Sequence, residues 1–178
     1  MPARTPNTID KPSFTDSQVF VECDDLIVSK TDLDSRITYA NKPFCYYSGF
    51  REKELLGQPQ NIVRHPDMPR AIYYLMWEHL KQDQEFFGYI KNRRKDGGFY
   101  WTFASVAPVY ENNQKTGYLS VRRCPGDSAI AVVEPLYRKM IELEKTLQKE
   151  QQIPMTSAIL WKAITKEFAT YAEFALSL

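Results

Sequence analysis

The sequence predicts an α+β fold whose main element is a sheet of antiparallel strands. Two short apolar runs, 26–30 and 36–40, flank the turn cluster Thr-Asp-Leu-Asp-Ser at 31–35, a pattern that predicts a hairpin. Short helical stretches follow, and after them come three strand-like runs at 86–92, 99–110 and 116–123. Strands on both sides of a helical middle are typical of an α+β order with the helices gathered on one face of the sheet.

Prolines and glycines set the limits of the helices in the middle of the chain. Asn41 and Pro43 predict the start of a helix, and Gly49 predicts its end. The best predicted helix of this region, 69–82, has apolar residues at helical spacing, namely Ile72, Leu75, Met76, Trp77 and Leu80. The two tight turns later in the chain, 95–98 (Lys-Asp-Gly-Gly) and 111–114 (Glu-Asn-Asn-Gln), have the composition of hairpin turns.

The composition divides the chain into an arm at 1–24, a domain at 25–126 and a helical extension at 127–178. Prolines in the arm make a long helix implausible there. The extension starts with a heptad-like seam of Val133, Leu136, Met140, Leu143 and Leu147. We expect Pro154 to end this first helix and a second helix to run from about 156 to 178. The pair is expected to pack on the domain or on a second copy of the chain, and we predict a homodimer.

The overall composition is that of a globular protein. Of the 178 residues, 43% are hydrophobic and 25% are charged, and the net charge of +1 provides no general attraction to nucleic acid. The three cysteines lie far apart without metal-ligand spacing, so no metal site is predicted. Free thiols in a reducing compartment, and therefore a cytoplasmic location, are expected. The most apolar late segment carries charges and does not predict a membrane span.

Two polar clusters are the most informative segments of the chain. Residues 64–69 (Arg-His-Pro-Asp-Met-Pro) place a cation, an imidazole and a carboxylate on a loop stiffened by two prolines. Residues 92–95 (Asn-Arg-Arg-Lys) stand at the end of a predicted strand. Such groups on a rigid loop and a strand end can hold a charged or aromatic ligand in one orientation.

With these motifs, residues 25–125 resemble a PAS domain, and within that family the sensor domain of bacterial aerotaxis receptors. Tyr-Ala-Asn at 39–41, Gly-Gln-Pro at 57–59 and Lys-Asp-Gly at 95–97 match the general PAS pattern, and both polar clusters match the aerotaxis type. The resemblance implies a five-stranded antiparallel PAS sheet. It also implies non-covalently bound FAD, whose redox state responds to oxygen and is converted into a chemotaxis signal through a downstream receptor domain or the chemotaxis machinery.

The resemblance also implies which positions bind the flavin: Asn41, Arg64, His65, Asp67, Trp77, Phe86 and Asn92. Relatives commonly have tryptophan where this chain has Phe86. Phenylalanine keeps the aromatic face but loses the indole N–H donor. From the residues alone, an asparagine amide suits the imide edge of a flavin, and an arginine suits its diphosphate. Structural alternatives remain open: Asn41 can be a helix cap, Trp77 a core residue, and Arg64 a partner of Asp67.

The sequence also bears on three alternatives to a flavin sensor. A light-sensing flavin adduct needs a cysteine near 59–61, and none stands there. A haem-binding oxygen sensor would need His65 or His79 as the axial ligand. A cofactor-free PAS dimerisation module is the third alternative. No catalytic signature, phosphate-binding glycine loop or metal-ligand constellation is present in the sequence, so we expect no enzymatic activity.

Overall fold

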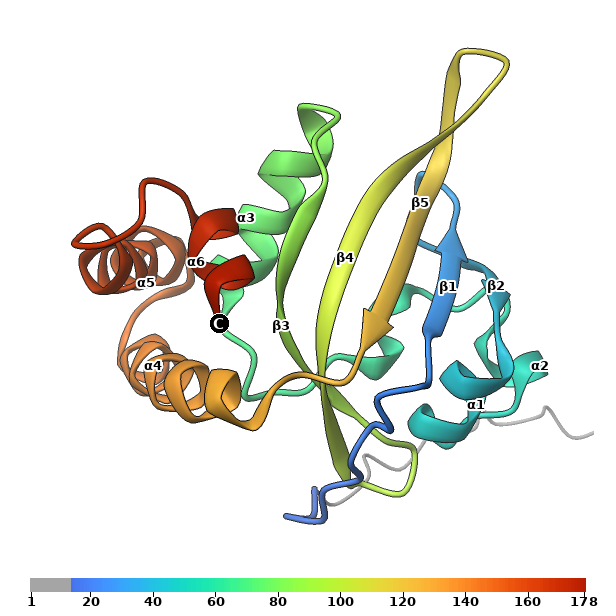
Figure 1. The fold of residues 1–178 in the computed structure, drawn as a ribbon, viewed down its shortest axis with the longest axis horizontal. Coiled ribbons are helices and arrows are strands. Elements are labelled where there is room, and N and C mark those ends of the chain that lie inside the picture. The colour runs from blue at the N-terminus through green and yellow to red at the C-terminus, as the bar shows by residue number, and fades with distance from the viewer. Residues whose placement is uncertain (1–13) are drawn as a thin grey trace, which may run out of the picture.

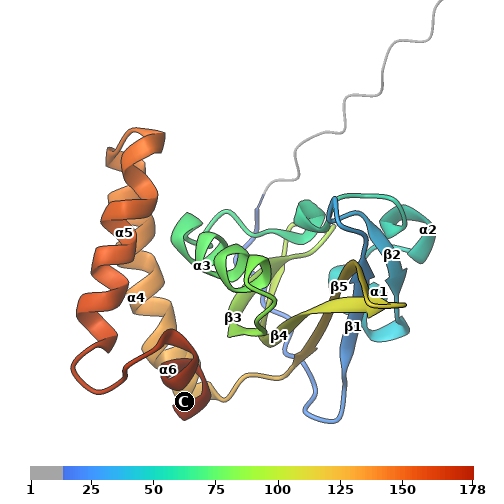
Figure 2. The same ribbon diagram turned by 90° about the horizontal axis from the view of Figure 1, so that it is seen from above.

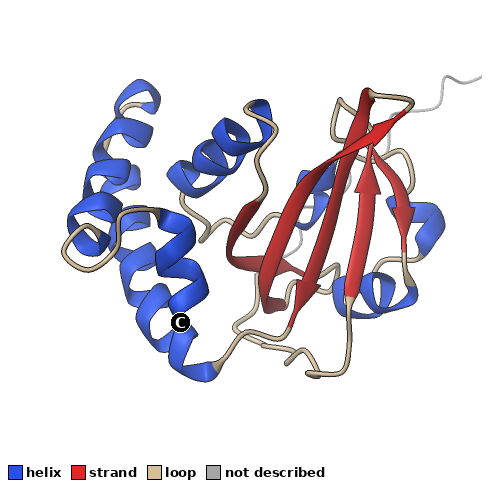
Figure 3. Cartoon of the chain, turned by 45° about the horizontal axis from the view of Figure 1, so that its top comes forward, coloured by secondary structure: helices blue, strands red, loops and turns tan. Residues whose placement is uncertain are grey.

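The computed structural model describes residues 14–178, and these residues form the predicted α+β fold. Its five-stranded antiparallel sheet has the order β2-β1-β5-β4-β3. The strands are β1 (Ile27–Thr31), β2 (Ile37–Ala40), β3 (Phe86–Arg93), β4 (Phe99–Glu111) and β5 (Gln114–Arg123). The helices are α1 (Lys42–Ser48), α2 (Glu52–Leu55), the 3₁₀ helix η1 (Gln60–Val63), α3 (Arg70–Lys81), α4 (Asp127–Thr146), α5 (Lys149–Ile164) and α6 (Tyr171–Ser177). Figures 1 and 3 show the sheet with helices at both ends of it.

Local sequence signals account for the helix ends and turns of the domain. Asn41 caps α1 by accepting a hydrogen bond from the Phe44 N–H at 3.0 Å, and Gly49 ends the helix with a left-handed φ of 73°. The β4–β5 turn has positive φ at Asn112 and Asn113, 50° and 63°, as a tight hairpin requires. The predicted strand and turn positions in this part of the chain are therefore confirmed.

The helical extension differs from its predicted form at two places. The first helix ends at Thr146 rather than at Pro154, and Pro154 lies inside α5. Pro154 is exposed and lies in the second turn of α5, where it removes one backbone hydrogen bond and crowds the carbonyl of residue i−4, yet the helix continues through it. The predicted second helix is also divided, because Thr170 starts α6 with a capping box to Glu173. The Thr-x-x-Glu pattern was present in the sequence as a signal for this start.

The extension packs on the domain of its own chain. In Figures 1 and 2, α4 and α5 run side by side next to α3, while α6 lies near β3. A buried tyrosine network joins them: the Tyr137 hydroxyl donates to the Tyr89 carbonyl at 3.2 Å and lies 2.8 Å from the Tyr171 hydroxyl. Tyr89 in turn donates to the Ala175 carbonyl at 3.2 Å. Of the two packing modes expected, the structure has the intramolecular one.

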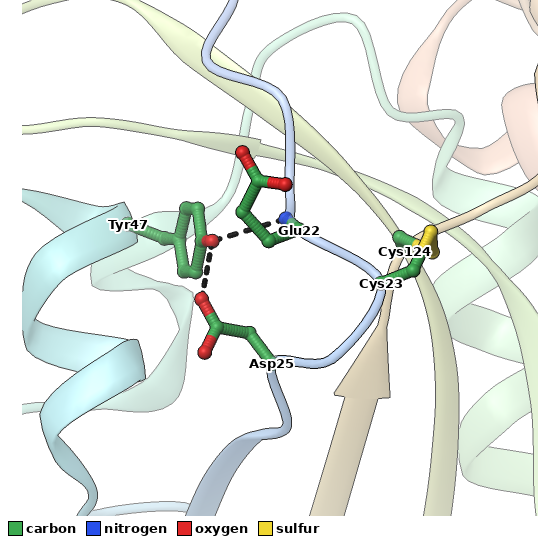
Figure 4. The surroundings of a disulfide bond; sticks show 5 residues. All are labelled: Glu22, Cys23, Asp25, Tyr47 and Cys124. Atoms are coloured by element: carbon green, nitrogen blue, oxygen red, sulfur yellow. Dashed lines mark hydrogen bonds between the residues drawn. A yellow bond between two sulfur atoms is a disulfide. The ribbon is translucent and has the colours of Figure 1, made fainter.

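The cysteines correct one expectation from the sequence. Cys23 and Cys124 form a disulfide across a sequence separation of 101, and only Cys45 is free among residues 14–178. Figure 4 shows that the segment before β1 is also held by Tyr47, whose hydroxyl donates to Asp25 Oδ2 at 2.6 Å. Spacing in sequence could not show this pairing, because antiparallel pairing of β1 with β5 is what brings the two thiols together.

No helix of the described part of the chain has both the length and the apolar character needed to cross a bilayer. The first 13 residues of the predicted arm lie outside the described residues.

Because the disulfide closes a long loop, we expect it to restrict the unfolded chain strongly. Replacing both Cys23 and Cys124 by serine should lower the free energy of unfolding by about 2–4 kcal/mol. Urea unfolding with and without a thiol reductant measures this difference. The reductant should destabilise the wild type and the Cys45→Ser control alike, but leave the double variant unaffected. Equal stability of wild type and double variant under oxidising conditions would contradict the expectation.

Candidate functional site

A cavity of about 310 Å³ lies between α3 and the sheet, with η1 along one side. This volume is within the range of small-molecule sites. Its apolar walls come mainly from α3, β3 and β4, and they include Tyr73, Met76, Trp77, Ile90, Ala104 and Val106. Its polar lining includes Ser29, Gln60, Arg64, Asn92, Ser120 and Arg122. The cavity therefore combines an apolar interior with a limited set of hydrogen-bonding groups.

Strand alternation explains how one face of the sheet supplies most of this lining. Ile90 and Asn92 are two residues apart on β3, and so are Ser120 and Arg122 on β5, so each pair points to the same face. On β4 the lining residue Ala104 is small, and a larger side chain there would fill part of the space. The cavity lies between two apolar cores, since Val63 belongs to one cluster and Ile90 belongs to the other.

The two polar motifs of the sequence meet on the cavity wall. The backbone of Arg64 pairs with that of Asn92 as an isolated antiparallel bridge. The Arg64 guanidinium stacks 4.3 Å above the Tyr73 ring and donates to the Met68 carbonyl at 3.5 Å. The amide nitrogen of Asn92 donates to Thr102 Oγ1 and to the Ile90 carbonyl, both at 3.2 Å. These contacts set the orientation of the Asn92 amide before any ligand arrives.

Of the seven predicted site residues, Arg64, Trp77 and Asn92 line the cavity. Trp77 lies in the α3 wall, with its ring edge-on to Tyr118 at a centroid distance of 5.4 Å. Asn41, His65, Asp67 and Phe86 are outside the lining. The structure thus brings together Trp77 of α3, Asn92 near the end of β3 and Arg64, the first residue after η1.

Asn41 and Phe86 have structural contacts instead. Besides capping α1, the Asn41 side chain accepts from the Val28 N–H at 3.0 Å and donates to the Leu26 carbonyl at 2.7 Å. Phe86 is buried and stacks on Tyr171 of α6 at a centroid distance of 5.7 Å. The change from tryptophan therefore falls at the contact with α6, where a phenyl ring needs no hydrogen-bond partner.

His65 and Asp67 belong to a charged cluster behind the cavity wall. His65 is buried between the rings of Phe14 and Phe99, and its Nδ1 accepts from the Asp67 N–H at 3.1 Å. Asp67 pairs with the buried Lys91 at 3.3 Å, and Lys91 also lies 3.8 Å from Glu134 of α4. Burial, together with the charge of Lys91, lowers the pKa of His65 to about 4, while Asp67 opposes the shift. The cluster links this loop to β3 and to the first helix of the extension.

Among the polar cavity residues that the sequence analysis did not identify are Ser29, Gln60, Ser120 and Arg122. Gln60 Nε2 and Ser120 Oγ are buried without a hydrogen-bond partner in the described part of the chain. The available signal was the alternation in β5, where Tyr118, Ser120 and Arg122 share one face. Inward-facing polar residues on a central strand indicate a lined cavity rather than a packed core.

The lowered pKa of His65 makes the protein sensitive to acid. An unfolded histidine titrates near 6.5, so between about 6.5 and about 4 the unfolded chain binds a proton that the folded chain does not. The contribution of neutral His65 to stability is complete above this window and is lost as the pH falls through it. In the His65→Asn variant, whose amide oxygen can replace Nδ1, the stability loss between pH 7 and 4.5 should be smaller. Urea titrations at the two pH values measure this loss, and a His65→Asn variant that loses as much stability as the wild type would contradict the assignment.

Comparison with known proteins agrees with this fold and with the two motifs. The family described as "PAS fold" matches residues 37–122. The aerotaxis receptor of Escherichia coli is 43% identical over 129 residues, which are 72% of this chain and 26% of the receptor. The nitrogen fixation regulatory protein of Klebsiella pneumoniae is 35% identical over 104 residues, 58% of this chain and 21% of that protein. The chain therefore spans about a quarter of the length of these relatives.

Solved structures show the same fold. A light-oxygen-voltage domain studied with a flavin analogue superimposes with a TM-score of 0.54 at 20% identity, covering 61% of this chain and 82% of that one. The light-oxygen-voltage domain of the photoreceptor aureochrome 1 gives 0.53 at 18% identity, covering 68% and 91%. The sheet order, the family match and the identity to the receptor lead to one conclusion. This chain belongs to the PAS family, and its domain is of the aerotaxis-receptor type.

Proposed function

We propose that the cavity binds FAD non-covalently and that the domain senses redox state or oxygen for aerotaxis or energy taxis. The observation that carries the proposal is the meeting of Arg64 and Asn92 on one wall of an apolar cavity. A flavin ring needs a flat apolar slot with a few donors and acceptors at its edge, and the ring would supply the redox chemistry when bound. Relatives named as an aerotaxis receptor and a nitrogen fixation regulator support a sensory role.

The residues present fit such a group. Trp77 and Tyr73 on α3 face Ile90 and Val106 on the sheet across the cavity, as an aromatic ring system requires. The Asn92 amide, already oriented by Thr102, can meet an imide edge. The side chain of Arg64 is half-buried beside the exposed Asn61 and can reach a diphosphate near the entrance. The adenosine half of the cofactor would extend beyond the enclosed space.

The positions of the histidines favour a flavin over haem. Neither His65 nor His79 lines the cavity. An axial haem ligand must present a ring nitrogen to the metal inside the binding pocket.

We further propose that residues 25–126 are the sensor and that 127–178 transmit its signal, in a cytoplasmic dimer that acts on a downstream receptor domain. Two contacts support this route. Lys91, which precedes Asn92 on β3, pairs with Glu134 of α4. The rings of Trp101 and of Tyr137 on the same helix lie 6.2 Å apart, measured between their centroids. A change of hydrogen bonding at the ligand can bias the position of α4 through these side chains.

The visible absorption spectrum of the purified protein tests the cofactor directly. We expect flavin bands, and the cofactor released by denaturation should migrate as FAD in chromatography. Asn92→Ala should weaken FAD binding by about tenfold, the loss of roughly one well-placed hydrogen bond. The exposed amide control Gln114→Ala should bind like the wild type. A Soret band, or a folded colourless protein that takes up no added FAD, would refute the flavin proposal.

Hydrogen exchange tests the signal route. Reducing the flavin should change the exchange rates of the α4 amides, and Glu134→Gln should diminish that change because it removes the charge facing Lys91. Glu142→Gln changes an exposed carboxylate on the same helix and should leave the response intact. A response of wild-type size in the Glu134 variant would rule out this ion pair as part of the route.

A further inference from the structure

Arg122 is a buried cation on the cavity wall that has no anionic partner among residues 14–178. Its side chain lines the cavity, and the residue is 5% exposed. One guanidinium nitrogen donates to Ser29 Oγ at 3.1 Å, and the guanidinium carbon lies 5.3 Å from the centre of the Phe44 ring. No aspartate or glutamate of the described chain forms an ion pair with it. The guanidinium remains charged, so the fold buries an uncompensated positive charge at this place.

The groups beside Arg122 are also donors without partners. Ser29 accepts from Arg122 and donates to Gln60 Oε1 at 3.3 Å, so it holds both side chains in place. Gln60 Nε2 and Ser120 Oγ then have no hydrogen-bond partner among residues 14–178, and both residues line the cavity. Ser120 is only 7% exposed. A guanidinium, an amide N–H and a hydroxyl that line one cavity form a site for a group rich in hydrogen-bond acceptors and negative charge.

A flavin nucleotide carries two groups of this kind, the diphosphate and the acceptor edge of the ring. The depth of the cluster in the cavity indicates which of the two it binds. Ser120 and Arg122 are more than nine-tenths buried, whereas the exposed lining residues are Asp34, Pro59 and Asn61. The diphosphate must lie near the exposed side because the adenosine beyond it does not fit inside. The Asp34 carboxylate adds a negative charge on the exposed side, whereas Arg122 adds a positive charge at the deep end. The deep end is therefore the more positive part of the cavity. The acceptor edge of the ring, with its carbonyl oxygens and imine nitrogens, matches the deep donor cluster.

Building on the proposed function, we propose that Gln60, Ser120 and Arg122 receive the acceptor edge of the flavin ring and that Arg122 raises its reduction potential. A reduced flavin carries more negative charge than the oxidised one. A fixed cation in a desolvated site therefore binds the reduced form more tightly than the oxidised form. In this arrangement the buried charge costs folding stability and sets the redox range of the sensor.

The test compares Arg122→Gln with the wild type and with Arg123→Gln, an exposed arginine at the next position of β5. Binding of riboflavin, FMN and FAD is measured by fluorescence quenching. Arg122→Gln should weaken all three by a similar factor of about tenfold, because the contact is to the ring. Reductive titrations use dithionite, which supplies two electrons while solvent supplies the proton. In these titrations the midpoint potential of the flavin bound to Arg122→Gln should be lower than that of the flavin bound to the wild type. Arg122→Lys, which keeps the charge, should retain most of the wild-type potential, and the Arg123 control should match the wild type.

Stability of the flavin-free protein provides a second measurement. Removing an uncompensated buried charge should leave the melting temperature of apo Arg122→Gln equal to or above that of the wild type. A drop of several degrees would assign Arg122 to the core and overturn the proposal. So would an unchanged midpoint potential, or weakened binding of FMN and FAD with riboflavin unaffected, which would assign it to phosphate. If the wild-type protein binds no flavin at all, both the proposed function and this inference are refuted. If the wild type binds flavin but the Arg122 variants behave like it, only this inference is refuted.

Discussion

The contact between the loop after η1 and the edge of β3 is the interaction on which the rest of the structure depends. An edge strand exposes backbone groups that need partners, and here the loop supplies them. The Lys91 N–H donates to Met68 Sδ at 3.2 Å, and the Arg64 backbone pairs with Asn92. The Arg93 side chain donates to the Ile62 carbonyl at 2.6 Å. These bonds bring Arg64 to the cavity and set where α3 starts, so they position both walls of the site.

The same edge also holds the helical extension. Glu134 of α4 approaches Lys91, and Glu144 of α4 accepts from the Arg70 N–H at 2.8 Å, at the first residue of α3. Residues of α3, β3, α4 and α6 form one buried apolar cluster, so the extension shares a core with the domain. Packed cores shift between discrete arrangements rather than deform gradually. In the proposed function, a change at the cavity wall would therefore reach α4 as a discrete shift.

The cavity shows a compromise between stability and function. The core cluster around Ile27, Phe44 and Tyr100 is formed by apolar and aromatic side chains, and the Tyr100 hydroxyl in it has no hydrogen-bond partner among the described residues. The adjacent cavity keeps a buried guanidinium together with the unpaired Gln60 Nε2 and Ser120 Oγ. Burying polar groups without partners is unfavourable, and proteins retain them mainly where a ligand completes the hydrogen bonding. In this chain, the polar residues of β3 and β5 face the same space because strand alternation repeats every two residues.

The sequence alone determined the order of the elements, the hairpin turns and the PAS type, because these depend on local patterns such as the turn at Asn112 and Asn113 and the cap at Asn41. It also identified Arg64 and Asn92, since both stand in distinctive motifs. Contacts between distant residues were decided only by the tertiary structure. The Cys23–Cys124 bond, the burial of His65, the packing of Phe86 on α6 and the place of Arg122 all depend on strand pairing and helix docking. A local pattern carries no information on which distant segment completes the environment of a side chain, and that environment decides whether a polar residue caps a helix, joins an ion pair or faces a ligand.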